Sequence, residues 1–224
     1  MSRFQRALLC MSVLLVSVAA VPLTSRADSV IYSNLNSDPT HVYNGGIGYN
    51  VSGPNSGVGS IISAMTFTPG ANYDLSQIDL AMGYISGTNS FTLELVNDNG
   101  NQPGTTVLES WTVNNSPTFG TCCTLDTVTS PGILLQAGVQ YWLEAVPASD
   151  LYAAWNQNNT GARGTIAQSS SGVTWNVFPN NTTGAFDVLG TTPVPVPEPS
   201  AALLLGTAMG TMLVLVHLGS RRSS

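Results

Sequence analysis

Side chains suited to acid-base or nucleophilic chemistry are scarce between residues 28 and 190. His41 is the single histidine of that region, in the segment Asp38–His41. A Ser-His-Asp or Cys-His arrangement needs an imidazole beside its nucleophile, and a zinc site needs several nitrogen, sulfur or carboxylate ligands close together. A lone histidine in a polar loop provides neither. We therefore predict no catalytic residue, no metal centre and no cofactor.

Carboxylates offer another route, because a suitably separated pair can hydrolyse a glycosidic bond. Glu94, Glu109 and Glu144 lie in segments that alternate like strands. Glu94 and Glu144 have apolar neighbours on both sides, which predicts that the two side chains face solvent. An exported hydrolase is therefore the third of three functional hypotheses, favoured only if two carboxylates converge in a cleft.

An oxygen-rich segment, Asn97–Asn101, follows the strand-like residues around Glu94. Carboxylate and amide oxygens are the ligands that calcium prefers, but the segment lacks the spacing and the final glutamate of an EF-hand loop. Asn-Gly between two alternating segments is typical of a type I′ hairpin turn. A turn is the favoured interpretation, and a calcium loop is the alternative.

Four tryptophans are candidates for stacking on sugar rings. They are Trp111, Trp142, Trp155 and Trp175. Aromatic side chains in all-β proteins belong mostly to the core, which is the alternative for each of them. Trp142 is informative because Tyr141 and Leu143 must point to the face opposite its own.

The pair Cys122–Cys123 lies in a polar segment. A disulfide between adjacent residues, two reduced thiols, and cross-links to another chain are all compatible with the sequence.

The elements that carry these residues follow a period of two. Apolar and polar residues alternate in segments such as 78–84, 91–95 and 139–145, and short turn sequences rich in glycine, proline and asparagine separate them. We predict an antiparallel β-sandwich of jelly-roll type over residues 28–190, without amphipathic helices. Its predicted core includes Phe91, Leu93, Leu95, Tyr141 and Leu143.

The charge of this predicted domain is strongly negative. Residues 28–190 contain eleven carboxylates, one arginine, Arg163, and no lysine. Binding to a phosphate backbone depends on lysine and arginine, so nucleic acid is excluded as a predicted partner.

The N-terminal residues 1–27 have the composition of a secretory signal peptide. Arg3 and Arg6 precede an apolar stretch, residues 7–21, which ends before Pro22 and the small-residue pattern Ser25–Ala27. Cleavage is predicted between Ala27 and Asp28.

The C-terminal residues have the composition of a stalk and a membrane anchor. Residues 191–200 alternate proline with other residues and favour an extended chain. Residues 201–218 are long and apolar enough for a transmembrane helix. Arg221 and Arg222, in the tail 219–224, are then expected in the cytoplasm, which places the domain on the outer side of the membrane.

This tail resembles the PEP-CTERM sorting signal of exopolysaccharide-producing Gram-negative bacteria. The resemblance is carried by the arginine pair, the apolar segment and the motif before it, which consists of Val196, Pro197, Glu198, Pro199 and Ser200. It implies that an exosortase recognises and processes the tail near the motif, so these residues are substrate. A plain, uncut anchor is the alternative.

Residues 64–189 resemble the exported bacterial modules called choice-of-anchor domains, type R. The resemblance is carried by Phe67–Gly70, Leu75–Ile78, Leu93–Gly104 and Leu135–Leu143. It implies a surface location and a sandwich fold, without a known activity.

These features together predict an exported, non-enzymatic protein of the cell surface or extracellular matrix. The expected route passes through the inner membrane, where the C-terminal helix holds the domain on the periplasmic side. The expected partners are the exosortase and the membrane. A carbohydrate-binding module for exopolysaccharide is the second hypothesis.

Overall fold

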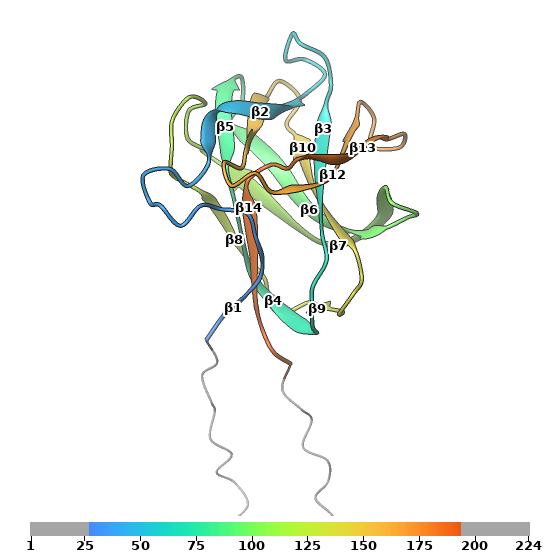
Figure 1. Cartoon of the computed structure of the whole chain (residues 1–224). Coiled ribbons are helices and arrows are strands. Elements are labelled where there is room, and N and C mark those ends of the chain that lie inside the picture. The colour runs from blue at the N-terminus through green and yellow to red at the C-terminus, as the bar shows by residue number, and fades with distance from the viewer. Residues whose placement is uncertain (1–26, 194–224) are drawn as a thin grey trace, which may run out of the picture. The chain divides into compact units, whose positions relative to one another are not determined.

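The computed structural model describes residues 27–193, which contain fourteen β-strands and no helix (Figure 1). The strands are β1 (Ser29–Ser33), β2 (Asn44–Ser52), β3 (Ile62–Phe67), β4 (Tyr73–Leu80), β5 (Met82–Ser86), β6 (Ser90–Asp98), β7 (Pro103–Asn114), β8 (Asp126–Thr129), β9 (Leu134–Leu135), β10 (Tyr141–Pro147), β11 (Tyr152–Gln157), β12 (Arg163–Ser169), β13 (Asn176–Thr182) and β14 (Phe186–Thr191).

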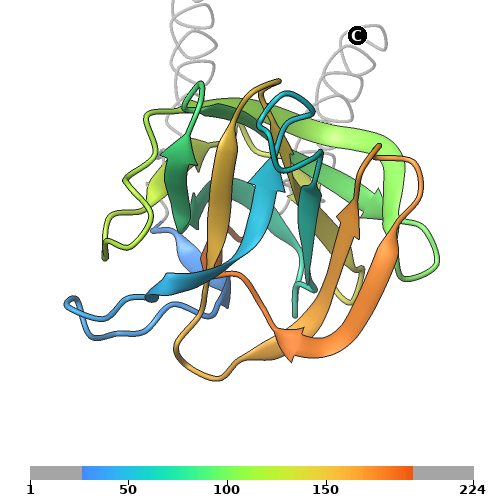
Figure 2. The ribbon, with the colours of Figure 1, turned by 90° about the horizontal axis from the view of Figure 1, so that it is seen from above.

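These strands form three sheets, and every strand pair in them is antiparallel. The first has the order β1-β14-β4-β8, with β9 also pairing with β4. The second has the order β13-β12-β3-β10-β6-β7, and the third the order β2-β11-β5. Figure 2 shows β2 and β11 side by side at the end of the unit nearest the viewer. The fold is all-β and sandwich-like, as the alternating pattern predicts.

The main core lies between the sheets and draws residues from all three of them. The five predicted core residues, Phe91, Leu93, Leu95, Tyr141 and Leu143, are all buried in it. Their alternation along β6 and β10 puts every second side chain on one face, so this prediction is confirmed. Burying their apolar surface away from water is the dominant favourable contribution to folding.

A second, smaller hydrophobic cluster covers the opposite face of the six-stranded sheet. Its buried members are Ala64, Val96, Trp142 and Ala167, and Trp175 and Val177 pack against them. Val177 is the cross-strand partner of Ala167, whose other partner is Ala64. The small alanines leave room for the larger side chains, so both faces of this sheet bury apolar surface.

The first and last strands of the unit are neighbours. β1 pairs only with β14 among the described strands, and Ser29 lies opposite Gly190 (Figure 1). β14 in turn pairs with β4 on its other edge. The start of β1 and the end of β14 therefore leave the sheet at the same place.

The predicted terminal segments lie almost entirely outside the described residues. This applies to the signal peptide apart from Ala27, to the motif Val196–Ser200, to the apolar segment 201–218 and to the tail with Arg221 and Arg222. Within residues 27–193, no helix meets the length and hydrophobicity needed to cross a membrane.

Candidate functional site

Two of the four tryptophans that were candidates for glycan stacking are fully buried, so the core alternative holds for them. Trp155 belongs to the main core, where its indole N–H donates to the Ala185 carbonyl at 3.1 Å and its ring meets the edge of Phe186. Trp142 lies in the second cluster, and its N–H donates to Asp98 Oδ1 at 2.8 Å. Neither ring presents a face to a ligand.

The other two tryptophans are half-buried and lie on opposite faces of the six-stranded sheet. Trp111, on β7, packs against the main core and donates its N–H to the Thr129 carbonyl at 2.9 Å. Trp175, just before β13, packs against the second cluster. The structure therefore does not gather the four tryptophans into one binding surface.

Glu94 and Glu144 are direct cross-strand partners on β6 and β10. Glu94 is half-buried, but Glu144 is 6% exposed, so the prediction that Glu144 faces solvent is wrong. It shares its face of the sheet with Trp142 and the second cluster, against which Val177 of the edge strand β13 packs. Burial, together with the charge of Glu94, raises the pKa of Glu144 to about 8.

This arrangement brings two carboxyl groups together without giving a substrate access to both. A general acid must come within hydrogen-bond reach of the bond that it protonates. Glu144 is nearly covered, and Glu109 is removed from the pair because it pairs with Leu95 and accepts a hydrogen bond from Ser130 Oγ at 2.6 Å. We therefore interpret the cross-strand pair of Glu94 and Glu144 as part of the packing of this sheet.

The segment Asn97–Asn101 forms a hairpin turn. The Asn99 N–H donates to the Gln102 carbonyl, and both central residues, Gly100 and Asn101, have positive φ, as in a type I′ turn. Asp98 accepts hydrogen bonds from Gln140, Trp142 and the Asn101 N–H. Burial opposes ionisation of Asp98, but these donors outweigh it and lower its pKa. Both carboxylate oxygens of Asp98 thus accept N–H groups, which favours the turn interpretation.

Cys122 and Cys123 are joined by a disulfide between adjacent residues, one of the alternatives open from the sequence. Cys122 is exposed and Cys123 is half-buried, in the segment that connects β7 to β8. The Val42 N–H lies 3.2 Å from Cys123 Sγ, so this disulfide contacts the connection between β1 and β2.

An open cavity of about 390 Å³ lies beside the disulfide, within the range of about 300–1,000 Å³ typical of small-molecule sites. Three connections meet there: the one between β1 and β2, the one between β7 and β8, and the one between β11 and β12. The lining residues are Thr40, His41, Tyr43, Asn44, Gly45, Gly46, Gly120, Thr121, Cys122 and Asn159.

Hydrogen bonds between the connections hold the walls of this cavity together. The Gly120 N–H donates to the Gly45 carbonyl at 3.0 Å, and the Asn159 side chain donates to the His41 carbonyl at 2.5 Å. The Tyr43 hydroxyl donates to the Thr124 carbonyl at 2.9 Å. Each bond joins residues more than 70 positions apart, so the cavity depends on the complete fold.

Gly45 permits the closest approach in this wall. A Cβ atom at Gly45 would lie 2.5 Å from the Thr121 carbonyl oxygen, so any other residue would push the two connections apart. The sequence identifies His41 and the cysteine pair as candidates, but it does not predict that they line the same cavity. Gly45 and Gly46 lie at the start of β2, although a glycine pair is typical of a turn.

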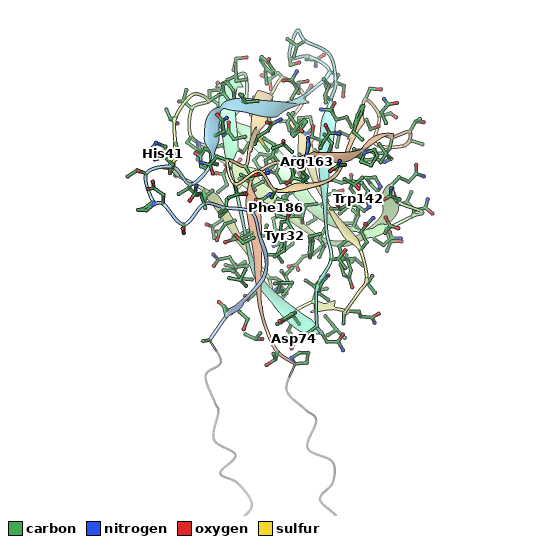
Figure 3. All side chains as sticks on the ribbon, viewed as in Figure 1. Tyr32, His41, Asp74, Trp142, Arg163 and Phe186 are labelled. Carbon is green, nitrogen blue, oxygen red and sulfur yellow. A yellow bond between two sulfur atoms is a disulfide. The ribbon has the colours of Figure 1, made fainter. Side chains whose placement is uncertain are left out.

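His41 and Trp142 lie on opposite sides of the unit (Figure 3). His41 is exposed, and its Nδ1 lies 3.2 Å from Asp38 Oδ2. Within residues 27–193, no cluster of three or more His, Cys, Asp or Glu side chains is placed to hold a metal ion.

A second open cavity, of about 340 Å³, lies at the end of the unit where β14 stops. It is lined by residues of β4, by the connection after β8 and by Thr191. Asp74, which Figure 3 places at this end, is its one charged lining residue.

Comparison with known proteins adds no assignment, because no family model and no curated protein matches the chain.

Proposed function

We propose that this chain is an exported, non-enzymatic protein of the cell surface or extracellular matrix, and that an exosortase processes its C-terminal tail. The β-rich unit, for which we propose a jelly-roll arrangement of choice-of-anchor type R, is the displayed part. The tail first holds this unit on the periplasmic side of the inner membrane and is then cut.

The observation that carries the proposal is the position of the two ends of the folded unit. β1 begins at Ser29, immediately after the predicted cleavage between Ala27 and Asp28. β14 ends at Thr191, the first residue of the proline-rich segment 191–200, and Ser29 lies opposite Gly190. Removing both terminal segments would therefore leave every strand of the sheets in place.

The Glu198→Ala variant is expected to retain its full-length C-terminus in a host that has an exosortase. Glu198 is the one charged side chain of the motif Val196–Ser200, so its loss removes the group that a processing enzyme is best able to distinguish. Membrane insertion should persist, because the apolar segment 201–218 is unchanged. Mass spectrometry of the intact protein distinguishes cut from uncut tails.

Val194→Ala is the matched control, because it alters the same proline-rich segment outside the motif, and it should be processed like the wild type. If wild-type protein from this host keeps its intact C-terminus, the sorting proposal fails and a plain anchor remains.

A further inference from the structure

We propose that the cavity beside Cys122 and Cys123 binds a short segment of a neutral saccharide. The four tryptophans do not supply such a site, and the cavity lies elsewhere in the fold. The proposal assigns a ligand class to the displayed unit. It rests on the proposed export because the disulfide beside the cavity persists in an oxidising compartment outside the cytoplasm.

The lining matches the two kinds of surface that a sugar ring presents. Ring hydroxyls need donors and acceptors along their edges, and the C–H faces need apolar surface. Asn44, Asn159, Thr40 and Thr121 supply amide and hydroxyl groups. The exposed disulfide at Cys122 supplies apolar surface that is fixed in place by its covalent bond to the next residue.

Much of the polar lining is already used within the protein, because the Thr40 hydroxyl bonds to Asp38 and His41 and the Thr121 hydroxyl donates to the Thr118 carbonyl. Within residues 27–193, one amide atom each of Asn44 and Asn159 is left without a protein partner. Asn44 accepts from the Gly46 N–H through Oδ1, and its Nδ2 makes no hydrogen bond. Asn159 donates through Nδ2 to His41, and its Oδ1 accepts none. One donor and one acceptor are thus available on amides that the structure holds in position, which reduces the entropic cost of binding.

The charge around the site selects against anionic ligands. No carboxylate, lysine or arginine lines the cavity. The surrounding residues 28–190 carry eleven carboxylates and one arginine, so an anionic polymer would be repelled as it approached. A neutral, hydroxyl-rich ligand needs no charged partner in the cavity and is not repelled by these carboxylates.

The test introduces a side chain at the cavity and at a matched position away from it. Gly46 lines the cavity, its φ is not positive, and a Cβ there would meet only Asn44 Oδ1, at 3.7 Å. Gly70 also lacks a positive φ and has open space around a Cβ, but it belongs to the connection between β3 and β4. Gly46→Leu should fill the cavity, whereas Gly70→Leu should leave it open.

The full-length oxidised protein is first applied to an array of neutral and uronate-containing oligosaccharides, in a detergent without a sugar head group where one is needed. The best neutral ligand is then titrated by calorimetry against wild type, Gly46→Leu and Gly70→Leu. We expect a neutral ligand to bind, with affinity lowered about tenfold or more by Gly46→Leu and unchanged by Gly70→Leu. A thermal melt of each variant reports whether it is folded.

A second variant addresses the disulfide itself. Cys122→Ser combined with Cys123→Ser removes the apolar surface and should weaken the same ligand at least about threefold in folded protein. Binding of uronates alone, binding of no oligosaccharide, or equal affinity of folded Gly46→Leu and wild type would each overturn the proposal. These outcomes are independent of tail processing, because the assay uses unprocessed protein.

Discussion

The Trp155→Ala variant is expected to lose about 3–5 kcal/mol of unfolding free energy, the usual cost of truncating a fully buried aromatic side chain. Trp155 is 0% exposed, touches Phe186 edge-on and satisfies its indole N–H with the Ala185 carbonyl. The truncation leaves a cavity in the main core and removes one of two hydrogen bonds to the Ala185 carbonyl, which still accepts from the Ala81 N–H. Because domains of this size have about 5–15 kcal/mol of stability in total, much of the population should unfold on mild heating. Urea unfolding followed by circular dichroism measures the loss.

Trp175→Ala provides the matched control for this change. Trp175 is half-buried and covers only the second cluster, so its truncation should cost clearly less. Equal losses for the two variants would contradict the burial that distinguishes these tryptophans.

The stability of the wild-type protein is expected to fall as the pH rises from about 4.5 to about 8, and Glu144→Gln should remove much of this fall. In the folded protein the pKa of Glu144 is raised to about 8 from its ordinary value of 4.5. Within that window the folded state binds a proton that the unfolded state releases, so each increase in pH favours unfolding. The difference in pKa corresponds to at most about 5 kcal/mol between the two ends of the window.

Two further buried carboxyls also favour unfolding as the pH rises. They should account for the decrease in stability with pH that remains in Glu144→Gln. Burial raises the pKa of Asp126 to about 6, and burial together with neighbouring Asp79 raises that of Asp187 to about 7. Denaturant unfolding of wild type and Glu144→Gln at pH 5, 6, 7 and 8 separates the contributions. Parallel pH profiles for the two proteins would show that Glu144 is ionised in the folded state.

The main core could be predicted from sequence because it depends on a local pattern. Alternation along β6 and β10 identifies one face regardless of what the rest of the chain does, and all five predicted residues are buried. The same reasoning predicts that side chains on the opposite face of these strands are exposed to solvent. It fails for Trp142 because Trp175 and Val177 pack against its cluster on that face, and it fails for Glu144, which lies on the same face between Ala64 and Glu94.

The cavity could not be predicted from sequence for a related reason. Its walls come from residues 40–46, 120–122 and 159, which are brought together by the pairing of distant strands. Single-sequence patterns identified the cysteine pair and the histidine, but nothing local places Asn159 against His41. The proposed sorting motif Val196–Ser200 is local to the sequence, and its proposed function depends on another protein.

If the chain is exported as proposed, the pairing of β1 with β14 has a consequence for the timing of folding. β1 is the first strand to be synthesised, and its one partner among the described strands is the last, completed at Thr191. A chain that crosses the membrane from its N-terminus must therefore wait for nearly the whole unit to emerge before the first sheet can close. Until then β1 has no hydrogen-bonded partner strand, and its backbone is accessible to proteases and chaperones. Only a short stretch of chain separates Thr191 from Glu198, so under the proposed export the last strand would emerge shortly before the proposed sorting motif.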